Sequence, residues 1–347
     1  MNKISTLTKQ LNPKNTKTNE PLASHTYLKI GGPADVFYEA RDTNDMINVI
    51  KLAKLQKIPV TILGRGSNVL VSDAGIRGLV IKNMTSTIKI SGEKPVQESK
   101  IKVKPRWEAD TKSGSFKYEF RDLDYDESKQ PRIEVKLDSG VDLPFAINYL
   151  IDKGITGLQW YSGIPGTIGG AVFNNIHGGT HFLSEVLSEV KALDKELEIK
   201  DIKIKDLKLD YDKSRFHDSG EIILQATLNL YKGDAEKAKQ VAIEWAKRKS
   251  IQPRNSAGCT FANISSEQKE KLGFPTTSVG YIIEHELEMS GYRVGDAAIS
   301  DKHKNFIVNE GKATAKDYLA VMKEIQKRAK GELGIELVPE IILLGFN

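Results

Sequence analysis

Two short loops crowded with glycine constrain this sequence more than any other feature. The first is LGRGSNVLV at residues 63–71, and its leucine is the last residue of the apolar run PVTIL. The second is GIPGTIGGAVFNN at residues 163–175. Glycine tolerates positive φ and lets backbone N–H groups approach a phosphate closely. A tight turn explains either loop alone, but two such loops, with IGGPAD at residues 30–35, favour a ligand that carries a diphosphate.

Neither loop fits the commonest nucleotide-binding motifs. GRGSNV has valine where GxGxxG has its last glycine, and GIPGTIGG lacks the lysine of a P-loop. The usual dinucleotide-binding fold and the P-loop NTPases are therefore disfavoured. The hydroxyl groups of Ser67 and Thr167 add hydrogen-bond donors, and the second loop can place a helix N-terminus against an anion.

Apolar periodicity predicts alternating strands and helices. Strand patterns occur in ADVFYEA, GIRGLVIK, IEVKLDSG and EIILQATLNLY, and helical spacing occurs in DMINVIKLAKLQ, LPFAINYLIDKG and AEKAKQVAIEWAKRKSI. The segment from residue 257 onwards has a helix (SVGYIIEHELE), a strand (NFIVN), a long helix (AKDYLAVMKEIQKRAKGELG) and a last strand (ELVPEIILLG). It therefore reads as a second α+β unit.

A chain of 347 residues is long for one core, so we expect more than one domain. We predict a flexible polar lead-in at residues 1–20, a first domain at 21–233 and a second domain at 234–347. The charged segment 83–133 interrupts the first domain with strand-like pieces, KIKVK and FKYEF. It reads as an inserted hairpin or a partly disordered excursion, and we favour a surface β extension without chemistry.

Composition excludes several classes of protein. No stretch approaches ~18 uninterrupted apolar residues, so we expect no membrane helix. The N-terminus lacks the apolar centre of a signal peptide and the chain has one cysteine, so we expect a cytoplasmic protein. The net charge of +5 is spread along the chain and is weak evidence for nucleic acid. The sequence has neither a CxxC pair nor an HExxH motif, and we predict no metal.

Several motifs together resemble one family. TYLKIGGPAD, VTILGRGSNVLVSD and GIPGTIGGAVFNN resemble the flavin-binding domain of the UDP-N-acetylenolpyruvoylglucosamine reductases, and AGCTFAN, GYRVGDAAISDKHKNFIVN and ELVPEIILLG resemble their C-terminal part. The resemblance covers about 19–82 and 134–347, in the family's order, and matches its shorter type without a tyrosine-bearing loop. It implies an α+β fold: an FAD-binding domain of the vanillyl-alcohol-oxidase/PCMH type, built of two α+β subdomains, and a C-terminal α+β substrate-binding domain.

The resemblance implies an enzyme of peptidoglycan precursor synthesis. NADPH reduces the FAD, which then reduces the enolpyruvyl ether of a UDP-sugar to UDP-N-acetylmuramate. The partner is a small molecule, with neither nucleic acid nor membrane. The residues implied to bind the cofactor lie in the glycine-rich motifs: Gly31, Gly32, Gly64, Arg65, Gly66, Ser67, Asn68, Gly163, Gly166, Thr167, Gly169, Gly170, Ala171 and Asn174.

Cys259, the lone cysteine, and Glu340 are the first two catalytic candidates. A lone cysteine is more commonly a buried structural residue. In AGCTF, however, it matches the family's proton donor, and a thiol is mostly protonated at neutral pH yet far more acidic than serine. Glu340 in LVPEIILLG matches the family's catalytic glutamate, although an exposed position on an edge strand is the plain alternative.

The third candidate is Arg215. The family has an arginine directly after a tyrosine in this segment, and this sequence departs from that pattern. Here Tyr211 is followed by Asp212, which cannot grip a carboxylate as a guanidinium does. We hypothesise that Arg215, in the same segment, replaces the missing group; the alternative is a position that faces the surface. His177 stands where the family usually has a small residue. SDKHKNF at 300–306 matches a family motif that either supports the substrate pocket or forms a turn.

Two alternatives stay open. The first is an oxidase on the same flavin-binding fold, which would turn over with oxygen and without NADPH. The second is a flavin- or nucleotide-binding paralogue that has lost catalysis, for which Asp212 is the one supporting feature. The motifs around Cys259 and Glu340 favour the reductase over both.

Overall fold

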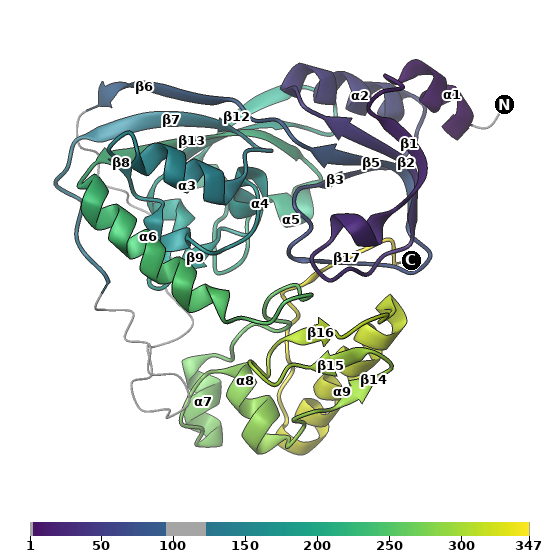
Figure 1. The fold of residues 1–347 in the computed structure, drawn as a ribbon, viewed down its shortest axis with the longest axis vertical. Coiled ribbons are helices and arrows are strands. Elements are labelled where there is room, and N and C mark those ends of the chain that lie inside the picture. Colours follow the sequence, from purple (N-terminus) through teal and green to yellow (C-terminus); the bar gives the residue numbers. More distant parts are fainter. Residues whose placement is uncertain (1–2, 95–122, 347) are drawn as a thin grey trace.

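A computed structural model describes residues 3–94 and 123–346 (Figure 1). The N-terminal subdomain is built on a four-stranded sheet in the order β1–β2–β5–β3. Its strands are β1 (Thr16–Pro21), β2 (Pro33–Ala40), β5 (Ile76–Asn83) and β3 (Val60–Leu63). β2, β5 and β3 run parallel to one another, whereas β1 is antiparallel to β2. Apolar side chains of α1 (Lys3–Gln10) and α2 (Thr43–Leu55) pack on this sheet.

The predicted flexible lead-in at residues 1–20 is wrong for the described residues 3–20. Leu7 of α1 is fully buried, and β1 forms an edge strand of the sheet. The polar composition misled because only one face of α1 is apolar, and because β1 pairs through its backbone. A strand at an edge needs few apolar side chains, since one side of it faces solvent.

The second subdomain has a six-stranded sheet in the order β12–β11–β13–β7–β6, with β8 pairing with β13. These strands are β6 (Ile88–Lys94), β7 (Arg132–Asp138), β8 (Ile155–Thr156), β11 (Leu187–Leu193), β12 (Ile199–Lys203) and β13 (Ile222–Lys232). Three helices bury apolar residues in the core of this subdomain: α3 (Leu143–Ile151), α4 (Ile168–Phe173) and α6 (Ala235–Ser250) (Figure 1). A short hairpin of β9 (His177–Gly178) and β10 (His181–Phe182) packs against the 3-10 helix η3 (Gln159–Tyr161), which in turn contacts α3 and α6.

The described ends of the segment 83–133 belong to this sheet. β6 pairs antiparallel with β7, which fits the predicted surface β extension as far as residue 94. Residues 123–131 return to the body of the subdomain and contact it through buried side chains. The pieces KIKVK and FKYEF fall within 95–122 and lie outside the described residues.

The C-terminal unit packs a three-stranded sheet against α9 (Ala315–Leu333). The strands are β14 (Arg293–Val294), β15 (Ala297–Ile299) and β16 (Ile307–Asn309), with α7 (Ser266–Leu272) and α8 (Val279–Tyr281) alongside. Thr314 caps α9 at its start, and Gly334, with φ of 69°, ends it in the left-handed conformation. The chain then returns to the N-terminal subdomain, where β17 (Ile342–Leu344) pairs parallel with β4 (Val69–Val71) (Figure 1).

Helix α6 bears on the predicted domain boundary between residues 233 and 234. Ala238, Val241 and Trp245 are buried in the core of the second subdomain rather than in the C-terminal core. The C-terminal core contains Ala257 and later residues, with Leu28, Ile30 and Leu70 contributed from the N-terminal subdomain. The division into domains stays a prediction, and this packing favours a boundary after α6.

Candidate active site

The two glycine-rich loops of the sequence lie directly against each other. A Cβ atom added at Gly64 would lie 2.9 Å from Oγ1 of Thr167, so the contact leaves no room for a side chain at 64. Ser67 Oγ donates a 2.7 Å hydrogen bond to the carbonyl of Pro165. Loops that are about 100 residues apart in the sequence therefore form one continuous surface between the two subdomains.

A cleft of about 650 Å³ opens at this contact. Gly64, Arg65 and Thr167 line it, together with residues 24–27, Lys29 and Phe145 in the first turn of α3. A volume of this size is typical of sites that bind small molecules. The cleft therefore joins residues of both glycine-rich loops in one candidate site for the cofactor.

Basic side chains give the cleft a positive character. Lys29, Arg65 and Lys82 line it, and Arg65 forms an ion pair with Asp142 and hydrogen-bonds the Tyr27 hydroxyl. Burial, with the positive charge of Arg65 in support, lowers the pKa of Lys82 to about 8. An ammonium group held in such surroundings is stabilised by a nearby anion. The donor set and the glycine-lined wall thus fit the diphosphate of FAD.

Several predicted cofactor-binding glycines instead allow close backbone packing. A Cβ at Gly32 would lie 2.1 Å from the carbonyl oxygen of Asp73, and one at Gly66 would lie 2.3 Å from that of His25. A Cβ at Gly163 would lie 2.9 Å from Cβ of Lys249 on α6, and one at Gly169 would lie 2.9 Å from Cβ of Ser139. At these four positions the lack of a side chain lets neighbouring segments pack closely.

The remaining predicted positions lie around the same loops. Gly31 packs against Val71, and the Gly166 carbonyl accepts a hydrogen bond from the amide of Leu143. Gly170 and Ala171 lie in α4, at whose start Thr167 Oγ1 accepts from the Gly170 amide, and Asn174 ends the helix. Asn68 has a separate role, because its side-chain amide donates a 3.2 Å hydrogen bond to the Glu340 carbonyl.

Cys259 and Glu340, the first two catalytic candidates, are brought together by backbone pairing. The Glu340 amide donates a 2.9 Å hydrogen bond to the carbonyl of Thr260, and Phe261 forms an isolated bridge with Pro339. The Asn68 contact and the pairing of β17 with β4 attach this segment to the first glycine-rich loop. The structure thus links the candidate acid, the candidate carboxylate and the cofactor cleft.

The surroundings of Cys259 keep its thiol protonated. Burial raises the pKa of the thiol, and the negative charges of Glu340 and Asp212 raise the pKa further, while Lys249 opposes them. The ordinary pKa of cysteine already predicts a protonated thiol, and the surroundings in the structure raise that pKa further. A thiol that stays protonated above neutral pH can act as a proton donor.

The loop that carries Cys259 is held by side chains of the C-terminal unit. Asn305 accepts from the Phe261 amide at 3.1 Å and donates to the Phe261 carbonyl at 2.8 Å. Thr260 Oγ1 and the Tyr318 hydroxyl lie 3.2 Å apart and are both buried. Asn305 therefore holds the loop that carries Cys259, and the Ser300 side chain accepts a hydrogen bond from the Lys302 amide within a turn. A role of SDKHKNF in the substrate pocket stays a prediction.

Arg215, the third candidate, is engaged elsewhere. Its guanidinium makes two hydrogen bonds to the Glu221 carboxylate, at 2.9 and 3.0 Å, and a third to the Asp206 carbonyl. Glu340, Lys249 and Asp212 are the described groups whose charges act on Cys259, and Arg215 is not among them. A catalytic role for Arg215 stays a prediction that these contacts do not support.

Lys249 is the charged residue that the sequence analysis missed. It lies in the last turn of α6, and burial lowers the pKa of its ammonium while the Cys259 thiol opposes the shift. It belongs to the run KRKS, in which adjacent basic residues give no signal of which one turns inward. Lys249 lies four residues, about one helical turn, after Trp245, so the two residues share a face of α6. This spacing is the one clue available in the sequence.

His177 and His181 have HxxxH spacing, but they lie on the two strands of a hairpin rather than on one helix face. Within residues 3–94 and 123–346, no group of three or more His, Cys, Asp or Glu side chains could hold a metal ion. Over the same residues, no helix is both long enough and apolar enough to cross a membrane.

The chain is a flavin-binding protein, because residues 34–104 match the model of an FAD binding domain. Residues 251–344 match the model of the UDP-N-acetylenolpyruvoylglucosamine reductase C-terminal domain. The UDP-N-acetylenolpyruvoylglucosamine reductase of Clostridium tetani is 34% identical over 346 residues, which are 99% of this chain and 96% of that protein. That of Caldanaerobacter subterraneus is 32% identical over 331 residues, covering 94% and 93%. This chain therefore belongs to the UDP-N-acetylenolpyruvoylglucosamine reductase family.

A solved structure agrees with this membership over nearly the whole chain. The crystal structure of UDP-N-acetylenolpyruvylglucosamine reductase (MurB) from Thermus caldophilus has a TM-score of 0.67 and 25% sequence identity, and covers 95% of this chain and 98% of that one. The predicted fold class, a two-part FAD-binding domain followed by a C-terminal α+β domain, is confirmed.

Proposed function

We propose that this chain is an FAD-containing reductase that uses NADPH to convert the enolpyruvyl ether of UDP-N-acetylglucosamine to UDP-N-acetylmuramate in peptidoglycan precursor synthesis. The observation that carries the proposal is the junction of Cys259, Glu340 and the cofactor cleft, which is made by the Thr260–Glu340 hydrogen bond and by the Asn68 contact. Membership of the reductase family supports the same reaction.

The residues that would hold FAD are those of the cleft. Gly64 and Thr167 offer a glycine-lined wall, and Lys29, Arg65 and Lys82 offer positive charge to the diphosphate. When bound, FAD supplies the hydride that it has accepted from NADPH. The other predicted positions, from Gly31 to Asn174, stay proposals for cofactor binding, and the close packing described above supports a shaping role for several of them.

The reaction asks the protein for a proton and for control of charge. When hydride adds to the terminal carbon of the enolpyruvyl group, the double bond's electron pair moves to the neighbouring carbon and its carboxylate. Cys259 donates its proton to that neighbouring carbon, which completes the saturated lactyl ether and leaves a thiolate that solvent reprotonates. Its raised pKa keeps the proton in place until the carbanion forms.

Positive charge for the anionic substrate comes, we propose, from Lys249. It is a described cation whose charge acts on the Cys259 thiol, whereas the Arg215 guanidinium is satisfied by Glu221 and Asp206. An ammonium near the developing enolate stabilises the transition state more than the ground state. Arg215 is retained as the competing candidate, and substituting each residue separates them.

One experiment tests the function as a whole. The purified holoenzyme should show the absorbance of bound flavin, lose it when NADPH is added without oxygen, and regain it when the UDP-sugar is added. Regain with the enolpyruvyl sugar and not with UDP-N-acetylglucosamine is the expected result. Bleached flavin that recovers with oxygen alone would favour the oxidase alternative, and failure to recover with either would favour the paralogue without catalysis. A cytoplasmic location stays a prediction.

A further inference from the structure

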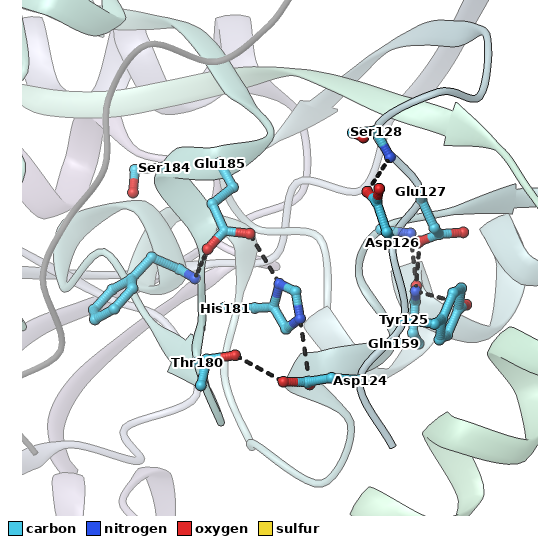
Figure 2. Close-up of polar contacts among 12 residues, drawn as sticks. Asp124, Tyr125, Asp126, Glu127, Ser128, Gln159, Thr180, His181, Ser184 and Glu185 are labelled. Carbon is cyan, nitrogen blue, oxygen red and sulfur yellow. Dashed lines mark hydrogen bonds and ion pairs between the residues drawn. The ribbon is translucent and has the colours of Figure 1, made fainter. Parts of the chain in front are cut away.

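The returning end of the charged insertion, residues 123–128, is a strap that polar contacts bind to the second subdomain (Figure 2). Glu127, which is 6% exposed, accepts hydrogen bonds from Thr156 of β8 and, at 2.8 Å, from the Gln159 amide of η3. The same amide donates to the Tyr125 hydroxyl at 3.0 Å. A buried carboxyl group is costly unless it is hydrogen-bonded, so these contacts give this part of the strap a defined position.

Aromatic contacts hold the same segment. The Tyr125 ring lies 5.1 Å from the ring of Trp160, which is 3% exposed. Lys237 Nζ lies 4.1 Å from the centroid of the Tyr125 ring, and Leu123 packs against the apolar core of the subdomain. The strap therefore covers part of η3 and contacts the first turn of α6.

His181 of β10 lies between the strap and a second carboxylate (Figure 2). Its Nε2 lies 3.4 Å from Oδ1 of Asp124 in the strap, and its Nδ1 lies 2.9 Å from Oε2 of Glu185. Thr180 Oγ1 donates a 3.0 Å hydrogen bond to the other oxygen of Asp124, and the His181 ring stacks on Trp160 at 4.1 Å. Both ring nitrogens of a protonated histidine are donors, whereas the neutral ring has one donor. One carboxylate at each nitrogen therefore suits the protonated form.

The side of this contact that lies outside the strap is fixed. Glu185 ends the 3-10 helix η4 (Leu183–Glu185), whose Ser184 amide donates a 3.0 Å hydrogen bond to the side chain of Asn175. Asn175 is fully buried and is the last residue of the second glycine-rich loop. Glu185 therefore belongs to the body of the subdomain, whereas Asp124 belongs to the strap. Opening of the strap would break one of the histidine's two ion pairs and leave the other.

The charges around His181 favour its protonated form. Although burial opposes the charge, Asp124 and Glu185 raise the pKa of His181 to about 9. From the elements packed around the ring, the titratable groups that face it are these two carboxylates and Glu127, whose pKa burial raises and protonated His181 lowers. Burial raises the pKa of Tyr125, so this hydroxyl stays neutral over the same range. Ionisation of the buried Glu127 also weakens the strap as pH rises, and a variant of His181 separates the two groups.

We propose that residues 123–128 are a pH-sensitive strap, which protonated His181 fastens to the body of the second subdomain and which loosens when the imidazole loses its proton. A neutral ring has one donor and cannot satisfy Asp124 and Glu185 together. The inference is independent of the proposed function, because the three side chains lie outside the lining of the cofactor cleft.

Opening of the strap lowers the affinity of His181 for its proton. In the fastened state its pKa is about 9; in the open state Asp124 is lost, so the pKa lies between this value and the 6.5 of an ordinary histidine. The strap is therefore most stable below the pKa of the open state. It loosens as pH rises toward 9, and above that pH the histidine has no further proton to lose.

Amide hydrogen exchange of the holoenzyme, followed by mass spectrometry and corrected for the intrinsic exchange rate, measures this opening. In the wild type, the opening equilibrium of peptides that cover 123–128 should rise roughly tenfold between about pH 7 and pH 9.5, because loss of an opposite charge shifts a pKa by a unit or more. Peptides within β13 should show no such rise. His181→Gln should expose the strap already at neutral pH and should keep only the pH dependence that belongs to Glu127.

Two further variants complete the test. Asp124→Asn removes only the strap's side of the contact, so it should loosen the strap roughly tenfold at neutral pH while β9 and β10 keep their protection. It also carries the test if His181→Gln does not fold. His285→Gln is the matched control: His285 lies 3.8 Å from the carboxylate of Glu284, but its side chain is 51% exposed. It should reproduce the wild-type profile.

Three results would overturn the inference. The first is a wild-type strap whose corrected exchange does not change over this range of pH, and the second is a His181→Gln variant that keeps the full rise, which would assign the pH dependence to Glu127. The third is a rise that β13 shares, which would indicate unfolding of the whole subdomain. None of them would bear on the reductase activity.

Discussion

The Glu340 amide donates a 2.9 Å hydrogen bond to the carbonyl of Thr260, and this bond joins two segments that are 80 residues apart in the chain. It places the carboxylate of Glu340 where its charge acts on the Cys259 thiol. A separate bond from Asn68 ties the same segment to the cofactor cleft. The acid and the carboxylate therefore depend on one strand-like pairing, and substitutions on either side should affect both.

Replacing Cys259 with alanine should slow the reduction of the UDP-sugar by roughly 10²–10⁴-fold, because the carbanion loses its proton donor. The reduction of flavin by NADPH should keep its rate, since the thiol takes no part in that step. Stopped-flow measurement of the two half-reactions separates them. Cys259→Ser should retain part of the rate; if the serine and alanine variants turned over equally fast, Cys259 would not be the acid.

The raised pKa of Cys259 predicts slow alkylation of its thiol, because the thiolate is the reactive form. Substituting its two charged neighbours should change the alkylation rate in opposite directions. Glu340→Gln removes a negative charge that raises the pKa, so more thiolate forms and alkylation by iodoacetamide at pH 8 should become faster. Lys249→Met removes a positive charge that lowers the pKa, so the reaction should become slower. Mass spectrometry of the lone cysteine gives the rates, and equal rates in both variants would contradict the proposed charge arrangement.

The sequence predicted those parts of the site that depend on local pattern. Two glycine-rich loops indicated a diphosphate ligand, and Gly64 and Thr167 do meet in one cleft. The charges around the thiol were harder to predict. Lys249 and Arg215 both lie in basic or charged segments, and which one turns toward Cys259 depends on how α6 packs and on the Glu221 carboxylate. Such long-range choices leave no periodic signal in a single sequence.

The same distinction between local pattern and long-range pairing applies to the helices and strands. The strands and helices with strong apolar periodicity, such as β13 and α9, were predicted near their observed places. The strand β1 was missed because its sequence, TKTNEP, is polar and its place in the sheet depends on backbone pairing. Its partner β2 determines the pairing, and a polar edge strand cannot be recognised without knowing that partner.

Gly64→Ala should weaken FAD binding, because the added Cβ would lie 2.9 Å from Oγ1 of Thr167 and push the two loops apart. The flavin content after purification and the Kd for added FAD measure the effect. Gly331→Ala is the control: a Cβ at Gly331, inside α9, has no described atom within 4 Å. It should bind FAD normally and be more stable by up to about 1 kcal/mol. Normal flavin binding by both variants would remove the loop contact from the cofactor site.

Arg215→Ala and Lys249→Met should have different consequences. Loss of Arg215 leaves Glu221, a mostly buried carboxylate, without its two hydrogen bonds, so the free energy of unfolding should fall by about 1–3 kcal/mol. The kcat of the folded fraction should change little. Loss of Lys249 should lower kcat at little cost in stability, since its buried ammonium is unfavourable in the empty site. A large loss of kcat in Arg215→Ala alone would restore Arg215 as the group that binds the carboxylate.

Lys82 predicts a dependence of stability on pH in the protein freed of FAD. Burial lowers its pKa to about 8 in the folded state, below the value of an unfolded lysine, so the unfolded state binds more protons between these two pH values. Stability therefore rises with pH through that window, and the penalty is fully present below it. Lys82→Met should raise the free energy of unfolding of the apoprotein at pH 7 by about 1–3 kcal/mol, with the gain vanishing toward pH 10.5.

The same substitution, Lys82→Met, should weaken FAD binding, because the cleft loses a cation. Denaturant unfolding at several pH values, with and without FAD, measures both effects; an apoprotein that Lys82→Met destabilises at pH 7 would show that the ammonium is already paired in the empty cleft.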